Sequence, residues 1–94
     1  MIIIRDVLIA KPGQASKLAA QMKSAGTAAG MTNFRVLTDV TGDFNRVVLE
    51  IEVDSISGFE AELKNYATNE TLHAALKGYT DLYQTGYREL LQTM

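Results

Sequence analysis

The stretch TNFRVLTDVTGDFNRVVLEIEV, residues 32–53, decides the fold because it can pair with itself as a β-hairpin around Gly42-Asp43. In this register the numbers of two facing residues add up to 85, and opposite charges face each other on one side. A shift by one residue would destroy this match, so the pattern fixes the register. We predict strands at 32–41 and 44–53, joined by a two-residue turn. The charged pairs are Arg35–Glu50 and Asp39–Arg46.

The two faces of this hairpin differ in chemistry, which predicts what lies on each. The apolar face should lie under helices; it carries Phe34, Val36, Leu49 and Ile51. The other face must be covered or used, and we predict that a second copy of the chain covers it. That predicted dimer face carries Arg35, Leu37, Asp39, Arg46, Val48 and Glu50, with Glu52 beyond them. In the alternative, this face lines a polar barrel lumen in which Arg35 holds a substrate carboxylate.

The segments before the hairpin read as a strand and a helix. Residues 2–10 are rich in isoleucine and valine on both faces, which predicts a central strand covered on both sides. Apolar residues then recur every three or four positions over 14–29, which predicts a helix. Gly30 is suited to end it, since glycine readily adopts the left-handed conformation found after many helices.

A broken helix and a final strand should follow the hairpin. The first helix should start within 54–57, where Ser57 and Glu60 have the spacing of a capping box. An interruption at 68–69 separates it from a second segment, whose apolar ridge continues to Tyr83. Thr85-Gly86 should end that segment. We predict a last strand at 87–93, a stretch that could also be helical.

The resulting order, β-α-β-β-α-β, predicts an α+β protein with a ferredoxin-like fold, in which both helices cover one face of an antiparallel sheet. Residues 1–94 should form one domain, since a chain of this length builds a single core. A chain this short buries only about 60–65% of its unfolded surface, so a partner chain would add useful burial.

Composition narrows the classes of function. The net charge is −2 without any basic cluster, which argues against nucleic acid as a partner. The apolar start at residues 2–4 is too short for a signal peptide or a membrane span, so we expect no membrane partner. The chain has no cysteine, which excludes disulfides and thiolate metal sites and fits a cytoplasmic location.

One histidine and four tyrosines are candidates for chemistry. His73 is the only histidine and could move a proton near neutral pH, although a surface position is the simpler interpretation. It has no second ligand at four residues' distance, so we expect no metal site. Tyrosines gather in the last third of the chain and could line a pocket for a phenolic or quinoid molecule, or simply pack. The tyrosines in question are Tyr66, Tyr79, Tyr83 and Tyr87.

Arg5 and Asp6 interrupt the first strand on opposite faces. Whichever side chain points toward the helices must find a partner or line a cavity, because an unpaired buried charge is costly. Arg5 in that position would be an anion anchor, and Asp6 would be a base with a raised pKa. The sequence does not decide between the two, so both are candidate pocket residues, together with Tyr79 and Tyr83.

The chain resembles the dimeric α/β-barrel superfamily, and within it the NIPSNAP-like proteins and the antibiotic biosynthesis monooxygenases. The similar segments are Lys11-Pro12-Gly13 after the first strand, the hairpin tip Thr41-Gly42-Asp43, the passage 47–56 and the ending 85–91. The resemblance implies a homodimer whose two sheets close a barrel. It also implies a cavity between sheet and helices for a small apolar molecule, used in several enzymes without metal or organic cofactor. The haem-degrading branch of this superfamily uses an asparagine on the first strand, and a tryptophan and a histidine on the second helix. This chain has no tryptophan and no asparagine before Asn33, and only His73 could match, so the resemblance argues against that activity.

Two functions therefore remain in view. The first is a homodimer with a pocket for a small apolar or aromatic molecule, acting in its enzymatic version as a cofactor-independent monooxygenase, isomerase or cyclase. His73 and Tyr66 would then be the catalytic residues that move a proton. The second is a non-catalytic binding or dimerisation module whose pocket is filled by its own side chains. The sequence leaves open whether the protein is an enzyme.

Overall fold

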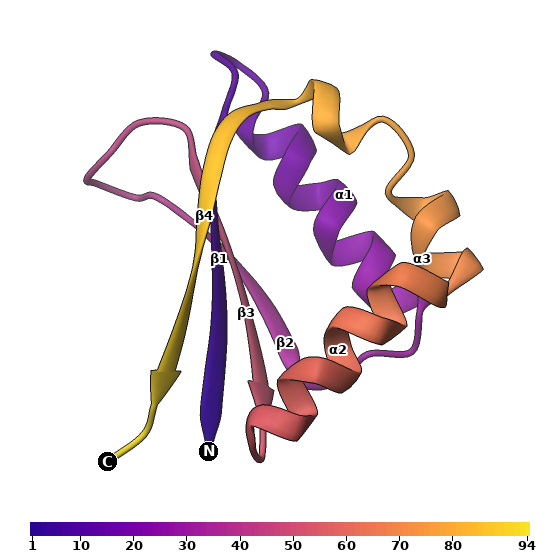
Figure 1. Ribbon diagram of the computed structural model, residues 1–94. Helices are drawn as coiled ribbons and strands as arrows, with labels where there is room; N and C mark the ends of the chain where they lie inside the picture. The colour runs from indigo at the N-terminus through magenta and orange to yellow at the C-terminus, as the bar shows by residue number, and fades with distance from the viewer.

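The chain forms a four-stranded antiparallel sheet with its helices on one face, as the computed structural model of residues 1–94 shows (Figure 1). The strand order is β2-β3-β1-β4, which is the predicted ferredoxin-like arrangement. In chain order the elements are β1 (Ile2–Ala10), α1 (Ala15–Ala28), β2 (Phe34–Thr38), β3 (Arg46–Val53), α2 (Ile56–Thr68), α3 (Glu70–Ala75), the 3₁₀ turn η1 (Tyr79–Asp81) and β4 (Tyr83–Gln92). The prediction of an α+β, ferredoxin-like fold is confirmed.

The hairpin register is confirmed, but its two-residue turn is wrong. β2 and β3 pair from Phe34 opposite Ile51 to Thr38 opposite Val47, always with residue numbers that sum to 85. The ladder ends there, and residues 39–45 form a loop that extends away from the helices (Figure 1). Arg46 joins the ends of this loop through its side chain, 2.9 Å from the Asp39 carboxylate. The predicted Asp39–Arg46 pair therefore exists, but these two residues are joined by their side chains and not by the β2–β3 ladder.

β1 is the central strand, paired with β3 on one side and β4 on the other. Ile2 and Ile4 pack in a buried cluster with Ile51 and Val53 of β3 on the helix-covered face. The opposite face is covered by no element of the chain (Figure 1). We call this opposite face, with Arg5, Arg35 and Glu50 at its centre, the open face.

α1 supplies two of the five residues of a second buried cluster. Leu18 and Met22 from this helix are buried against Ala10, Val47 and Leu82. The helix ends as predicted: Gly30 has a φ of 76°, and the backbone N–H of the next residue, 31, donates to the Gly26 carbonyl at 3.0 Å.

The helix after the hairpin begins and breaks for local reasons. α2 starts at Ile56 with Ser55 in the N-cap position, so the expected capping box of Ser57 and Glu60 is wrong because both residues lie inside the helix. The predicted interruption is confirmed at Asn69. Its side-chain oxygen accepts a hydrogen bond from the Leu72 N–H at 3.0 Å and so starts α3.

The last strand begins earlier than predicted, at Tyr83 rather than at residue 87. Gly86 therefore continues the ladder opposite Leu8 and does not break it. A Cβ at this position would lie 2.7 Å from the carbonyl oxygen of Val7 and 2.7 Å from a methyl group of Leu8. Glycine is thus needed here for the close approach of β4 to β1. The interpretation of Gly86 as a helix breaker does not reveal this requirement.

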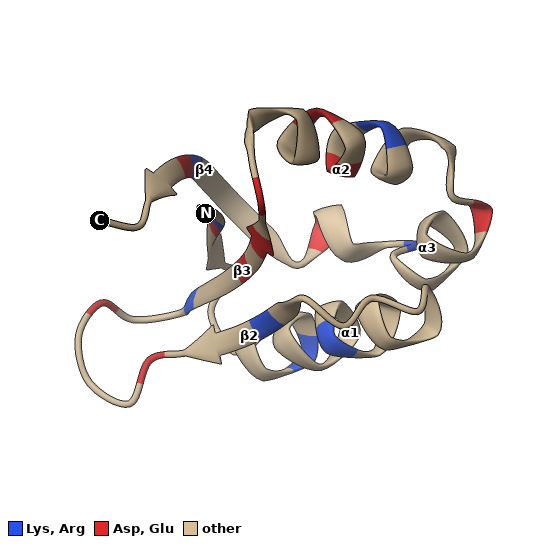
Figure 2. Cartoon of the chain, turned by 90° about the horizontal axis from the view of Figure 1, so that it is seen from below, with Lys and Arg blue, Asp and Glu red and all other residues tan.

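The charges of the chain are interspersed, as Figure 2 shows, and the net charge is −2. No helix combines the length and the apolar character that crossing a bilayer requires. The charged residues that matter most for the site below are those that the register places on either face of β1.

Candidate functional site

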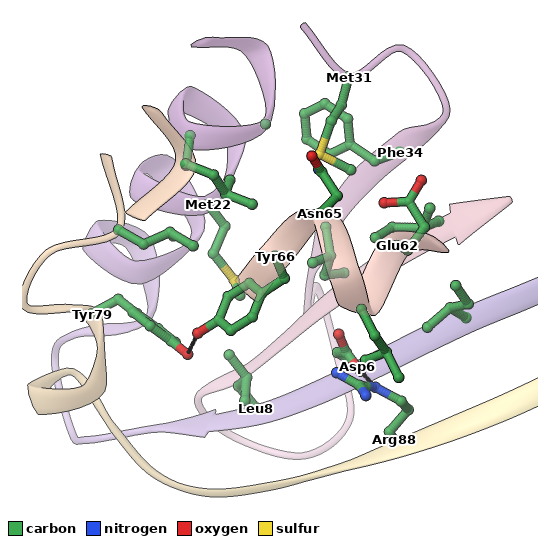
Figure 3. A pocket seen from close by; sticks show the side chains of 18 of the residues that line it. Asp6, Leu8, Met22, Met31, Phe34, Glu62, Asn65, Tyr66, Tyr79 and Arg88 are labelled. Carbon is green, nitrogen blue, oxygen red and sulfur yellow. Dashed lines mark hydrogen bonds and ion pairs between the residues drawn. The ribbon is translucent and has the colours of Figure 1, made fainter. Parts of the chain in front are cut away.

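A pocket of about 400 Å³ lies between the helix-covered face of the sheet and the helices (Figure 3). Its size is typical of small-molecule sites, which measure about 300–1,000 Å³. Sixteen of its 21 lining residues are hydrophobic, so a ligand would meet mainly aliphatic and aromatic side chains. The sheet contributes Ile4, Asp6, Leu8, Phe34, Leu49, Ile51, Tyr83, Tyr87 and Arg88, and the helices and their connections contribute Met22, Ala25, Gly26, Met31, Phe59, Glu62, Leu63, Asn65, Tyr66, Leu72, Leu76 and Tyr79.

The pocket exists because α2 stands off the sheet. None of the residues of α2 is buried, although its apolar stripe faces the sheet. α1 lies closer, helped by its small residues: a Cβ at Gly26 would come within 2.3 Å of the Phe34 ring. The Phe34 ring thus occupies the space that a larger residue at 26 would need, and forms one end of the pocket beside Met31 (Figure 3).

The structure answers which of the two β1 charges faces the helices: Asp6 does. Its Oδ1 accepts a hydrogen bond from Nε of Arg88 at 2.6 Å, across the β1–β4 pair. The Arg88 guanidinium also lies over the ring of Phe59, 5.7 Å from the ring centroid. Asp6 is therefore a paired carboxylate on the pocket wall, and the pair places a guanidinium in a mainly apolar cavity.

Arg5 does not line the pocket, so its prediction as a pocket residue is corrected. Its side chain lies on the open face because neighbouring residues of a strand point to opposite sides. There its Nε donates to Glu50 at 2.6 Å, and Arg35 of β2 approaches the other oxygen of the same carboxylate at 2.6 Å. Arg5 is also 3.9 Å from Glu89. Three strands are thus linked by side chains at one buried glutamate, which is only 4% exposed.

The two arginines decide the charge state of Glu50. Burial by itself would raise the pKa of this carboxyl, but the hydrogen bonds and charges of Arg35 and Arg5 outweigh burial and lower it. Glu50 is therefore ionised at neutral pH, held at the centre of the predicted dimer face.

Three tyrosines meet at the end of the pocket away from Phe34. The hydroxyls of Tyr66 and Tyr79 are 2.8 Å apart (Figure 3). The ring centroids of Tyr79 and Tyr83 lie 5.7 Å apart. Burial, followed by the hydrogen bond with Tyr66, raises the pKa of the Tyr79 phenol above its usual value. Tyr79 thus stays protonated and can take part only as a neutral hydrogen-bonding group.

His73 is not among the residues that line the pocket, although it contacts Tyr66, which is. Its Nε2 donates a hydrogen bond to the backbone carbonyl of Tyr66, and its ring lies 5.6 Å from the Tyr66 ring. The histidine thus contacts the residue with which it was predicted to act, but through that residue's backbone carbonyl and ring and not through its hydroxyl. This contact holds the end of α2 against α3.

Sequence reasoning missed several polar residues of the pocket. Arg88 is the most important, and Glu62 and Asn65 of α2 also reach the cavity (Figure 3). A signal for Arg88 did exist: once β1 and β4 are paired antiparallel, a register that places Arg88 opposite Asp6 matches their charges. The predicted last strand at 87–93 contained Arg88, but its register against the first strand was not assigned. No group of three or more acidic or histidine side chains is arranged to hold a metal ion.

Solved structures with the same fold include several NIPSNAP proteins. A NIPSNAP domain protein from Burkholderia xenovorans superposes with a TM-score of 0.83, at 15% identity, over 100% of this chain and 95% of its own. A NIPSNAP family protein from Agrobacterium tumefaciens superposes with a TM-score of 0.84, at 12% identity, over 99% and 92%. No protein-family model and no curated protein matches the sequence.

A second group of similar structures carries a functional name. A putative antibiotic biosynthesis monooxygenase from Chloroflexus aurantiacus superposes with a TM-score of 0.73, at 18% identity, over 99% of this chain and 92% of its own. The expected resemblance to NIPSNAP and monooxygenase proteins is thus confirmed at the level of fold. At such low identity a shared fold does not carry over an activity.

Proposed function

We propose that the protein is a homodimer that binds a small apolar or aromatic molecule in the helix-side pocket of each chain. The observation that carries this proposal is the apolar pocket of about 400 Å³ with a few polar groups at defined places. The alternative, a dimerisation module with a filled interior, fits this cavity less well. The lack of cysteine agrees with a cytoplasmic location, which we include in the proposal.

The open face supports the homodimer. Only 14 of the 94 residues are buried within one chain, so a partner would contribute substantially to burial. The open face also combines charges with exposed apolar side chains such as Leu37, which is 40% exposed. A second sheet placed on this face would cover both kinds of side chain.

Sedimentation velocity at micromolar concentration tests the dimer. Arg35→Glu should shift the wild-type dimer toward monomer, because two acidic side chains would then face each other at Glu50 within the interface. Glu50→Arg should do the same, and the double exchange should recover part of the affinity. Lys23→Glu, on the exposed side of α1, is the matched control and should leave the dimer intact. A monomeric wild type would reject the homodimer.

A second candidate function is oxygenation of the bound molecule without a cofactor. The similar structures that are named antibiotic biosynthesis monooxygenases favour this candidate. In such a reaction an activated CH₂ group between aromatic rings of the substrate would take up O₂; one oxygen atom would become the new carbonyl and the other would leave as water with the two hydrogens. Tyr66 would contact the substrate, with His73 behind it, since Tyr66 lines the pocket and His73 does not.

Oxygen uptake with a panel of polycyclic phenols tests this candidate. The combined change Tyr66→Phe and His73→Gln should abolish turnover of any substrate found, while binding measured by fluorescence should persist. Full activity in the double variant would reject both residues as catalytic. Lys64→Gln, an exposed change on the same helix, serves as the control.

A further inference from the structure

Arg88 is placed as an anchor for an acidic group. Asp6 is the only residue with which it makes a hydrogen bond or ion pair. A guanidinium carries five N–H donors, and one carboxylate can accept from only some of them, so donors remain for a ligand. The Asp6 bond and the stacking on Phe59 hold the group in place while its side chain is still 45% exposed. Such a preorganised guanidinium is suited to bind a carboxylate or sulfonate.

The tyrosine pair offers a second, neutral contact. When two hydroxyls share a hydrogen bond, only one proton lies between them, so the accepting phenol keeps its own proton. Between Tyr66 and Tyr79 one O–H is therefore left to donate to a ligand oxygen. Leu8 lies between this pair and the Asp6–Arg88 pair in Figure 3, so apolar wall separates the two polar places.

We propose that the ligand of this pocket is an aromatic monoacid: its acidic group binds Arg88, its ring system lies against the apolar wall, and an oxygen at its far end accepts a hydrogen bond from the Tyr66–Tyr79 pair. The proposal rests on the proposed function, that is, on the pocket being a binding site. Two acidic side chains of the pocket, Asp6 on the sheet and Glu62 on α2, limit the ligand to one negative charge, because they repel a second one.

Two fluorescent probes of the same shape separate charge from shape. 8-Anilino-1-naphthalenesulfonate carries one sulfonate, which stands in for a carboxylate, and N-phenyl-1-naphthylamine is its neutral counterpart. Both are titrated into the full chain, with circular dichroism to verify that each variant is folded. The wild type should bind both probes and prefer the sulfonate.

Arg88→Gln and Asp6→Asn should have opposite effects. Arg88→Gln should raise the Kd of the sulfonate about tenfold, the scale of one charge-assisted contact, and change that of the neutral probe less than about twofold. Asp6→Asn should lower the Kd of the sulfonate, because it removes a repelling charge and releases Arg88. If the two residues only supported the fold, both changes would weaken binding alike. Lys23→Gln, outside the pocket, should change neither Kd.

Each outcome supports or overturns the proposal. Equal losses for both probes in Arg88→Gln, or weaker sulfonate binding in Asp6→Asn, would overturn the acidic ligand. A wild type that binds only the neutral probe would also overturn it, while leaving the pocket function intact. A wild type that binds neither probe would reject the pocket function itself. Should Arg88→Gln not fold, the direction of the Asp6→Asn effect decides.

Discussion

The two long helices share one face of the sheet but are held by it to very different degrees. α1 buries Leu18, Met22, Ala25 and Gly26, whereas α2, of nearly the same length, buries no residue at all. The apolar side chains of α2 stay partly open: Leu63 is 41% exposed and Tyr66 is 44% exposed. One helix completes the core, and the other covers the pocket.

Because of this difference, we expect α1 to determine mainly the stability of the fold and α2 to affect mainly the binding of a ligand. A segment with few buried contacts opens at a low free-energy cost, which is a common property of the elements that admit ligands. α1 fixes the sheet, whereas few buried contacts would have to break for α2 to admit a molecule to the proposed binding site. Changes in α1 should therefore act on folding, and changes in α2 should act on binding.

The largest expected effect is that of Leu18→Ala in α1. Leu18 is fully buried, and a truncation of this kind leaves a cavity that costs about 3–5 kcal/mol. We expect the free energy of unfolding, measured with urea and circular dichroism, to fall by that amount.

Leu63→Ala in α2 is the matched truncation in the other helix. Because Leu63 already contacts solvent, its loss should lower the free energy of unfolding by less than about 1 kcal/mol. It should nevertheless weaken binding of the neutral naphthylamine probe. Similar losses of stability at both positions would contradict the division between the two helices.

Gly26→Ala tests the place where α1 itself shapes the pocket. The added methyl group would overlap the Phe34 ring, which must then move toward the cavity. We expect a loss of about 1–2 kcal/mol, since overpacking costs about 1–3 kcal/mol and alanine recovers part of this through its helix propensity. Binding of the neutral probe should weaken as well. The double variant Gly26→Ala and Phe34→Leu removes the clash, and failure to recover stability there would contradict this account.

The sequence predicted the parts of the fold that depend on local pairing. The hairpin register followed from charges and apolar residues within 32–53, and the end of α1 followed from Gly30. Both depend on residues close together in the chain, where spacing fixes geometry. The loop at 39–45 could not be predicted in this way. The Asp39–Arg46 ion pair that closes it can form whether or not the backbones of the two strands stay paired up to the turn.

The site was harder to predict because its residues meet only through β4. The sequence indicated Asp6 and the tyrosines, but it left open which face each β1 charge occupies. That choice depends on the pairing of β1 with β4, 82 residues apart at Asp6 and Arg88. Gly86 was interpreted as a stop, whereas tertiary contact with Val7 and Leu8 is what requires glycine there. Long-range contacts thus determine both the pairing of Arg88 with Asp6 and the residue at which the last strand begins.

The smallest expected effect comes from the opposite face of the sheet, where acid should act on Glu50. Arg35 and Arg5 lower the pKa of Glu50 in the folded chain, so its bonds stabilise the fold above the unfolded pKa of about 4.5 and are lost as pH falls through the lower folded value. Because both arginines are partly exposed, the contribution to one chain should be about 1 kcal/mol or less. Urea unfolding of wild type and Glu50→Gln between pH 7 and pH 3 measures it: the stability difference should be largest near pH 7 and shrink at the acid end. A difference that is constant with pH would mean that Glu50 acts through packing alone. The Leu63→Ala variant, whose change lies on the helix side, should follow the pH profile of the wild type.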